Sequence, residues 1–383
     1  MSKRAPVLPV CCGAALICSL LTSSGCRGEK TFVAEIRNGV RYVHNIKPAS
    51  ERLVAGLAFV GKIGELESTD PDRQFVSPMS ADEDAAGNLF ILDNRESCVK
   101  KFDAKRNFLV RFGRKGQGPG EFEFAMSVGV TASGRVIVAT GTSEFHVFDN
   151  DGIYVDRFRL PPYRGISPAV LGSDRVVVYA FQLEGTNGPD NPVLAIFDFQ
   201  GQVRHEFGEP FLLDTARKTW NANFLSLAVD GDENIYAAFS SLNRIEKYSP
   251  DGRLVLSIDR VLPYEIAHRY ETSPMEIRGR VVEVDQPAFT PVNRGIGVDS
   301  RGRIWVLSFQ KAVSGLQPPK DIKIRDLVAF EIYSPAGVLL SRVPFPPEVV
   351  KFDNLTMRGD HLFIVDPFDE ACVYEYAVVD RDD

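Results

Sequence analysis

The stretch SVGVTASGRVIVAT (residues 127–140), followed by EFHVFDNDGIYVDRF (residues 144–158), carries the pattern that predicts the fold. Its apolar and aromatic runs are bounded by polar turns at residues 132–134 and after Phe148-Asp149. Runs of β-branched and aromatic residues between turn residues are typical of strands, and Gly, Asn, Asp and Ser accept the dihedral angles of tight turns. The stretch therefore predicts four short antiparallel strands.

The same plan occurs six times between residues 77 and 383. One turn signature separates the first two strands of each unit, at residues 84–88, 132–134, 172–174, 230–234, 299–302 and 358–360. A second follows an aromatic residue, at Asp103, Asp149, Asp198, Ser249 and Ser334. Repeats of about 40 to 70 residues with four strands each are typical of propeller blades.

The sixth unit ends after its third strand, near Val378, and lacks an outer strand. The segment LVAGLAFVGKIGEL (residues 53–66) precedes the first unit and has the character of an outer strand. Pairing this strand with the sixth unit would close the ring and cover its edge. An independent N-terminal hairpin is the alternative.

The strand pattern, followed by FGRKGQGPGEF (residues 112–122), resembles the NHL-repeat family of six-bladed β-propellers over residues 53–383. The first, second and fourth units match well, whereas the third and fifth are degraded and enlarged. The resemblance implies an all-β fold, a six-bladed β-propeller of four-stranded blades. It leaves function open, because propellers host lyases, lactonases and binding modules.

The glycine-rich residues 113–122 also raise the possibility of a phosphate-binding loop. Such a loop needs GxxxxGK[ST], or GxGxxG opening a helix, whereas Gly116, Gly118 and Gly120 alternate around Pro119 and lead into a strand. We expect these glycines to serve the tight crossing from the outer strand of one blade to the inner strand of the next.

The N-terminus resembles a bacterial lipoprotein signal. Lys3 and Arg4 precede a mostly apolar run that ends in Thr22-Ser23-Ser24-Gly25-Cys26, the layout of a signal peptide. The resemblance implies lipidation of Cys26, although Ser23 stands where leucine is usual; a plain signal peptide and an uncleaved anchor are the alternatives. We therefore expect a signal peptide over residues 1–25, a tether over 26–52, and an extracytoplasmic, membrane-anchored propeller over 53–383, in the periplasm or at the cell surface.

Composition sets further limits. The chain has 383 residues, 44% of them hydrophobic, and a formal net charge of −7, which is ordinary for a globular protein and disfavours binding to nucleic acid. Cys98 and Cys372 are the cysteines beyond the signal. They occupy equivalent positions on neighbouring blades, which are usually too far apart for a bridge, so we expect free, packed thiols.

Long insertions are predicted on one face. The chain reverses at each turn, so the blade connectors and the loops between second and third strands share a face, and they carry the insertions at residues 181–192, 207–223, 260–293 and 309–327. We expect a short helix near residues 263–269. Because rigid scaffolds position functional loops, we expect a binding face here, although drift of surface loops is the alternative.

The candidate binding residues are aromatic, basic or amide side chains, which suit a protein, peptide or glycan ligand of the cell envelope. They are Arg114, Lys115, Tyr163, Arg164, Trp220, Asn223, His268, Arg269, Tyr270, Arg278, Arg294 and Lys311. We expect the chain to be a monomer.

Catalytic motifs do not stand out. The five histidines have no metal-binding spacing, and GxSxG, HExxH and a CxxC beyond the signal are absent. The predicted channel ring mixes residue types and includes one carboxylate: Ser77, Met126, Ser167, Asn223, Arg294 and Asp353. We therefore expect no cofactor and favour a binding or scaffold module. The alternative is a metal-dependent propeller hydrolase or lyase with Ca or Zn at the channel.

Overall fold

The structure is a computed structural model that describes residues 29–160, 166–180, 191–277, 279–313 and 323–381. These residues form strands, one α-helix, α1 (Ala216–Ala222), and one 3-10 helix, η1 (Ile324–Asp326). The predicted all-β fold is confirmed. The predicted signal peptide and Cys26 lie outside the described residues. Within those residues, no helix has the length and apolar character needed to cross a membrane.

The first three repeat units each form a four-stranded antiparallel sheet, with the strands in chain order. The first consists of β4 (Pro78–Glu83), β5 (Leu89–Asp93), β6 (Cys98–Phe102) and β7 (Phe108–Phe112). The second consists of β8 (Ala125–Val130), β9 (Val136–Thr140), β10 (Glu144–Phe148) and β11 (Tyr154–Arg159). The third consists of β12 (Ile166–Leu171), β13 (Arg175–Tyr179), β14 (Leu194–Asp198) and β15 (Val203–Phe207).

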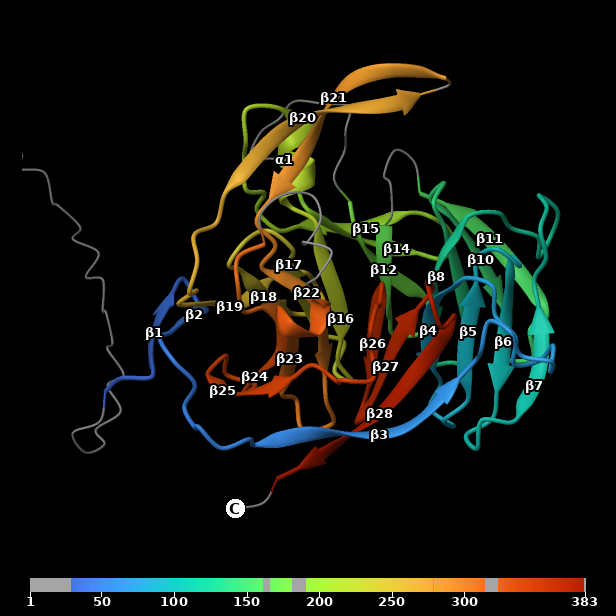
Figure 1. Cartoon of the computed structure of the whole chain (residues 1–383), viewed down its shortest axis with the longest axis horizontal. Coiled ribbons are helices and arrows are strands. Elements are labelled where there is room, and N and C mark those ends of the chain that lie inside the picture. Colours follow the sequence, from blue (N-terminus) through green and yellow to red (C-terminus); the bar gives the residue numbers. More distant parts are fainter. Residues whose placement is uncertain (1–28, 161–165, 181–190, 278, 314–322, 382–383) are drawn as a thin grey trace, which may run out of the picture.

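The fourth and sixth units gain strands from the N-terminal part of the chain, whereas the fifth does not. The fourth contains β16 (Leu225–Val229), β17 (Ile235–Phe239), β18 (Ile245–Tyr248) and β19 (Leu254–Arg260), and the fifth β22 (Asn293–Val298), β23 (Ile304–Phe309), β24 (Val328–Tyr333) and β25 (Leu339–Pro344). The sixth contains β26 (Asn354–Arg358), β27 (His361–Asp366) and β28 (Cys372–Asp380). Its fourth strand is β3 (Ala55–Ile63), which runs antiparallel along β28 as predicted for residues 53–66 (Figure 1).

The turns follow from local chemistry. In the turn after β10, the Asp149 carboxylate accepts hydrogen bonds from the backbone N–H groups of Asp151 and Ile153, and Gly152 adopts φ of +81°. Glycine is favoured at such an angle because it has no Cβ. In the first sheet Arg106 holds the equivalent place, at φ of +65°. Its side chain bonds Glu83 and Glu375, so a salt bridge to the sixth sheet accompanies this unfavourable backbone angle.

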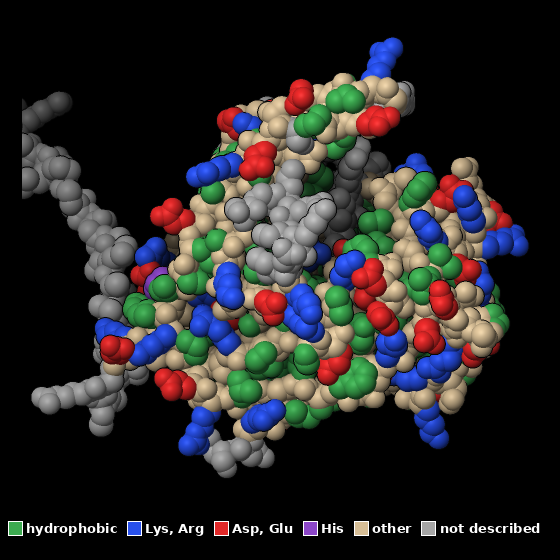
Figure 2. Space-filling view, viewed as in Figure 1, with side chains coloured by type: hydrophobic (Ala, Val, Ile, Leu, Met, Phe, Trp, Pro, Cys, Tyr) green, Lys and Arg blue, Asp and Glu red, His purple; other side chains and the backbone are tan. Residues whose placement is uncertain are grey.

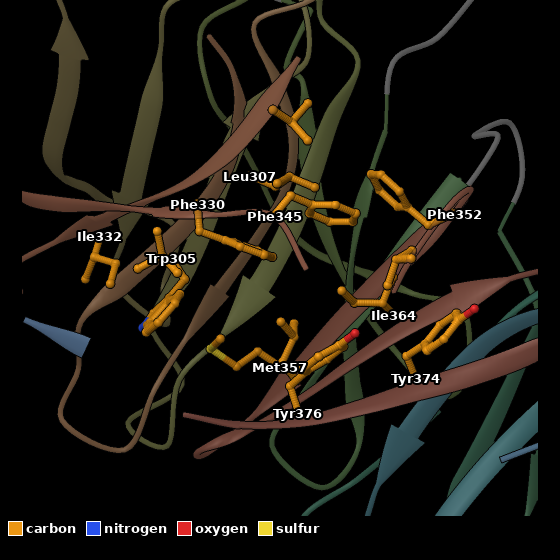
Figure 3. Close-up of a cluster of buried hydrophobic side chains, with 14 of the residues drawn as sticks. Trp305, Leu307, Phe330, Ile332, Phe345, Phe352, Met357, Ile364, Tyr374 and Tyr376 are labelled. Atoms are coloured by element: carbon orange, nitrogen blue, oxygen red, sulfur yellow. The ribbon is translucent and has the colours of Figure 1, made fainter. Parts of the chain in front are cut away.

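The first strands of neighbouring sheets contact one another in turn: β4 with β8, β8 with β12, β12 with β16, β16 with β22, β22 with β26, and β26 with β4. Apolar side chains fill the spaces between the sheets. Figure 3 shows one such layer, in which Trp305, Phe330 and Ile332 from the fifth sheet face Met357, Ile364 and Tyr376 from the sixth. Cys98 and Cys372 are buried and free, as expected, and burial raises the pKa of each thiol to about 12.

An N-terminal strap (residues 32–54) crosses the outside of the fourth and fifth sheets, in the segment where we expected a tether. β1 (Phe32–Arg37) and β2 (Val40–Asn45) form a hairpin, and β2 runs parallel to β19. The backbone N–H groups of Ala49 and Ser50 then donate to the carbonyls of Leu339 and Leu340 in β25. The strap therefore joins two sheets before the chain enters β3.

The insertion after β19 differs from the expectation. The predicted helix near residues 263–269 is wrong: the chain there is irregular and then enters β20 (His268–Ile277), which pairs with β21 (Arg280–Phe289). This long hairpin projects from the sheets beside α1 (Figure 1). Cross-strand pairing of ten residues outweighs the weak local helical preference.

Candidate functional site

The blade connectors and the loops between second and third strands lie on one side of the sheets. We call this side the connector face and define it by residues 113–124, 141–143, 208–224, 261–277, 279–292, 310–313, 323–327, 345–353 and 367–371. Both α1 and the β20–β21 hairpin belong to it. The turns on the opposite side are all short. Within the described residues, the long insertions therefore lie on one side of the sheets, as predicted.

A central cavity of about 580 Å³ opens between the first strands. All six first strands line it: β4, β8, β12, β16, β22 and β26. At the connector face its lining includes Met126, Phe224, Arg294 and Asp353, at or just before the starts of those strands. The volume is within the range of small-molecule sites.

A partly buried ion pair forms the floor at the opposite end of the cavity. The Arg358 Nε donates to Asp82 Oδ1 at 2.5 Å, and its Nη2 donates to Asp82 Oδ2 at 2.6 Å. The backbone N–H of Val130 adds a third donor to this carboxylate, at 2.7 Å. The Asp82 charge and burial act in opposite directions on the Arg358 pKa, and the charge raises it. The floor is thus electrically balanced and joins β4, β8 and β26.

The mouth of the cavity carries a looser pair. Arg294 Nη2 lies 3.7 Å from Asp353 Oδ1, and the two side chains are 44% and 40% exposed. Exposed pairs at such a distance contribute little stability. The Arg294 guanidinium also lies over the Phe352 ring, 5.6 Å from its centroid. A pair held this weakly can exchange its partner for a polar group of a ligand.

The cavity does not resemble a metal centre. Its carboxylates are Asp82 and Asp353, each next to an arginine, and its described lining contains no histidine or cysteine. Elsewhere, the atoms of Glu83, His361 and Glu375 lie within 4.8 Å of one another, but Arg106 already bonds both carboxylates. A cation would have to displace that guanidinium.

The structure brings some predicted channel residues together. Met126, Arg294 and Asp353 line the cavity, whereas Asn223 does not. Asn223 is fully buried at the end of α1, where its side-chain amide exchanges two hydrogen bonds with the backbone of Phe211, both at 2.8 Å. Its role is therefore to hold the connector. The Ser77 side chain is absent from the lining, and that of Ser167 is outside the description.

Three predicted contact residues pack within the insertions. The Tyr270 hydroxyl accepts a hydrogen bond from Asn221 Nδ2 at 2.9 Å, which joins the hairpin to α1. The His268 ring lies between Phe211 and Phe289, with centroid distances of 5.0 and 5.1 Å, and Trp220 packs edge-on against Phe224 at 4.5 Å. These aromatic contacts make α1 and the hairpin base one ordered unit.

The remaining predicted residues differ in availability. Arg114 bonds Glu121 at 2.7 Å through its Nε, and Arg114, Lys115, Arg269 and Lys311 are all exposed. Tyr163, Arg164 and Arg278 lie outside the described residues. Glu121 also accepts from the Gly118 N–H at 2.9 Å, and a Cβ on Gly113 would lie 2.6 Å from the Phe122 ring. The glycines thus shape a connector that leads into β8 and not into a helix.

Sequence reasoning missed the floor pair and the exposed Phe124. Asp82 stands near the end of the strand Pro78–Glu83, and Arg358 stands in a predicted turn. A buried charge within a strand is a usable signal, but its partner, 276 residues away, is not visible locally. Acidic and basic side chains are mixed over the face in Figure 2, without a large region of one sign.

No protein-family model and no curated protein sequence matches the chain. Among solved structures, a member of the DUF4221 family from Bacteroides vulgatus is similar over 85% of this chain and 99% of its own, with a TM-score of 0.57 and 11% identity. A protein from Bacteroides fragilis that is assigned as exported is similar over 89% of this chain and 100% of its own, with a TM-score of 0.55 and 11% identity. A virginiamycin B lyase from Staphylococcus aureus is similar over 83% of this chain and 98% of its own, with a TM-score of 0.45 and 9% identity. At such identities the likeness concerns the fold alone. The four-stranded sheets and the ring of contacts between their first strands are what support a β-propeller.

Proposed function

We propose that the chain is a six-bladed β-propeller closed by β3 that acts outside the cytoplasm as a binding or scaffold module through its connector face. Two contacts support the closed ring: β3 pairs with β28, and the first strand of the sixth sheet contacts the first strand of the first. The β20–β21 sheet is then an insertion and not a blade.

The observation that carries the binding role is the combination of the central cavity with one-sided, ordered insertions. The cavity offers apolar walls and the loosely paired Arg294 at its mouth. Hydrogen bonds and ring contacts tie α1 to the hairpin beside it. Ordered loops on a rigid scaffold present a surface with little entropy left to lose on binding. The ligand we propose is a protein, peptide or glycan of the cell envelope.

The location rests on the sequence of the first 26 residues and on the similarity to an exported protein. We propose anchoring through a lipid on Cys26. Mass spectrometry of the N-terminal peptide from membranes tests this directly: an acylated cysteine is expected, and an unmodified chain that begins elsewhere would contradict it.

Site-specific photo-crosslinking tests the binding face. A photoreactive amino acid at Met126, in the cavity lining, should capture a discrete envelope component in cells, and free ligand-containing extract should compete. The matched control places the same group at Asp251, an exposed position in a turn on the opposite side. Equal capture from both positions, or none from Met126, would contradict the proposal.

The metal-dependent alternative is separated by elemental analysis of the purified chain. A stoichiometric, tightly held Ca or Zn ion that is lost on substitution of Asp353 would favour the enzyme and refute the non-enzymatic role. With the cavity carboxylates already paired to arginines, we expect none.

A further inference from the structure

We propose that a second hollow on the connector face, at the second sheet, binds a neutral saccharide. It has a volume of about 690 Å³, and its lining shares no residue with that of the central cavity. One wall is formed by β10 and β11, at the right in Figure 1, and the other by residues 116–124 of the preceding connector. The inference is therefore independent of the central site.

The strand register creates the first wall. Glu144 of β10 lies opposite Arg159 of β11, and His146 lies opposite Arg157. Residues that are directly opposite, or two apart on one strand, share a face of the sheet. Four polar side chains are thereby gathered on the face of the second sheet that looks towards the connector.

These side chains present fixed donors and acceptors. Glu144 bonds Arg157 at 3.2 Å and Arg159 at 2.7 Å, and lies 3.4 Å from His146 Nε2. Burial opposes ionisation of Glu144, but Arg159, His146 and Arg157 hold its pKa below the usual value. Burial lowers the pKa of His146, against the opposing charge of Glu144. His146 Nδ1 is buried without a hydrogen-bond partner among the described residues, and its ring forms the inner wall.

The charges of the hollow cancel. Glu121 is paired with Arg114, and the remaining charged side chains of the lining are Glu123, Glu144, Arg157 and Arg159. The number of remaining carboxylates therefore equals the number of guanidinium groups. A ligand with a net charge gains nothing from such a site, whereas sugar hydroxyls, which donate and accept, can satisfy both kinds of group.

Phe124 supplies the complementary apolar surface. Its side chain is 68% exposed at the edge of the hollow, and its φ is +54°. A left-handed conformation is costly for a bulky residue, and so is an exposed ring, so their coincidence indicates a use. The Gly141 N–H donates to the Phe124 carbonyl at 2.9 Å and holds this geometry. An aromatic face beside hydrogen-bonding groups matches the C–H face and the hydroxyl rim of a sugar ring.

The experiment titrates the purified full-length chain, by calorimetry and NMR, with the methyl glycosides of glucose, galactose, mannose and N-acetylglucosamine. At least one should bind saturably. The same protein is titrated with glucuronate and inorganic phosphate, which should bind more weakly. Absence of binding by every neutral sugar, or tighter binding of the anions, overturns the proposal.

Two variants locate the site. Phe124→Gly removes the ring and relieves the left-handed backbone, so it should unfold at the same or a higher temperature while its sugar affinity falls by about tenfold or more. Glu144→Gln should weaken binding similarly. The matched control is Phe368→Ala, an aromatic residue 54% exposed on the same face outside this lining. Equal losses in Phe368→Ala would overturn the assignment.

Discussion

At the scale of single residues, the charged side chains that are most deeply buried between sheets depend on their ion-pair partners. Arg260 of β19 and Glu331 of β24 are both 1% exposed and form an ion pair at 2.5 Å. Arg260 also donates to Asn293, while Glu331 accepts from Tyr333 and Arg342. Burial opposes ionisation of Glu331, but the arginines hold its pKa below the usual value. Removing one partner would leave the other charge buried and without compensation for its lost hydration.

Arg260→Met should therefore lower the free energy of unfolding by about 3–5 kcal/mol, because Glu331 loses its buried partner. Arg342→Met is the matched control: Arg342 pairs with the same carboxylate but is 36% exposed, so its loss should cost about 1 kcal/mol. Urea denaturation measures both. Equal losses in the two variants would show that burial does not decide the strength of this network.

His146 should make stability depend on pH. Because burial lowers its pKa below 6.5 in the folded chain, the unfolded chain takes up this proton at a higher pH. The free energy of unfolding is then undiminished above about pH 6.5 and falls as the pH decreases through and below that value. His146→Phe should reduce the loss between pH 7 and pH 5 by roughly 1 kcal/mol. An unchanged pH dependence of stability in His146→Phe would contradict this assignment.

At the scale of elements, the N-terminal strap depends on one buried amide. Asn45 at the end of β2 is 0% exposed. Its Nδ2 donates to the carbonyls of Asp259 at 3.2 Å and Gly337 at 3.0 Å, and its Oδ1 accepts from the Leu339 N–H at 2.7 Å. A single side chain thus connects the strap to the outer parts of the fourth and fifth sheets.

Asn45→Ala should destabilise the fold by about 2–4 kcal/mol, because it leaves buried backbone groups without partners. Asn107→Ala is the control, since Asn107 is exposed and bonds only within its own turn, through Asp103. Hydrogen exchange of the Leu339 amide provides a local readout. A protected Leu339 amide in Asn45→Ala would show that the strap does not rely on this residue.

At the scale of the whole molecule, the N-terminal segment and the hairpin have different roles. Strand β3 pairs with the edge of β28 in the sixth sheet. The strap pairs with β19 in the fourth sheet and bonds β25 in the fifth, so it connects these two sheets. The β20–β21 hairpin instead projects beyond the sheets, and its outer part is exposed. The N-terminal segment is therefore part of the propeller, whereas the β20–β21 hairpin is an insertion outside its sheets.

Two deletions compare these roles. Removal of residues 29–63 should abolish cooperative unfolding, because it exposes the edge of β28 and the apolar layer behind it. Replacement of residues 268–289 by a short Gly-Ser linker should preserve cooperative unfolding while it abolishes the crosslink from Met126. Calorimetry measures both. Normal cooperative unfolding without residues 29–63 would contradict the closed ring. Loss of folding without the hairpin would show that the sheets need the hairpin in order to fold.

The predictions from sequence succeeded where the signal was local. In the turn after β10, the Asp149 carboxylate bonds backbone N–H groups of its own turn, and residue type alone predicted turns of this kind. They failed where distant contacts decided the outcome. Residues 263–269 carry no helix, and Asn223 supports a connector instead of facing the channel. His268 and Tyr270 stay candidate binding residues, and the structure adds that His268 packs on Phe211 and that Tyr270 bonds Asn221.

The sequence by itself determined the repeating strands, the short turns and the side on which insertions accumulate, because these depend on periodicity and turn chemistry within a few residues. Only the tertiary structure decided which charges meet. The Asp82–Arg358 floor, the Arg260–Glu331 pair and the Glu144 cluster each join different strands or sheets. Burial and partner geometry govern such groups, and neither is encoded in the spacing along the chain.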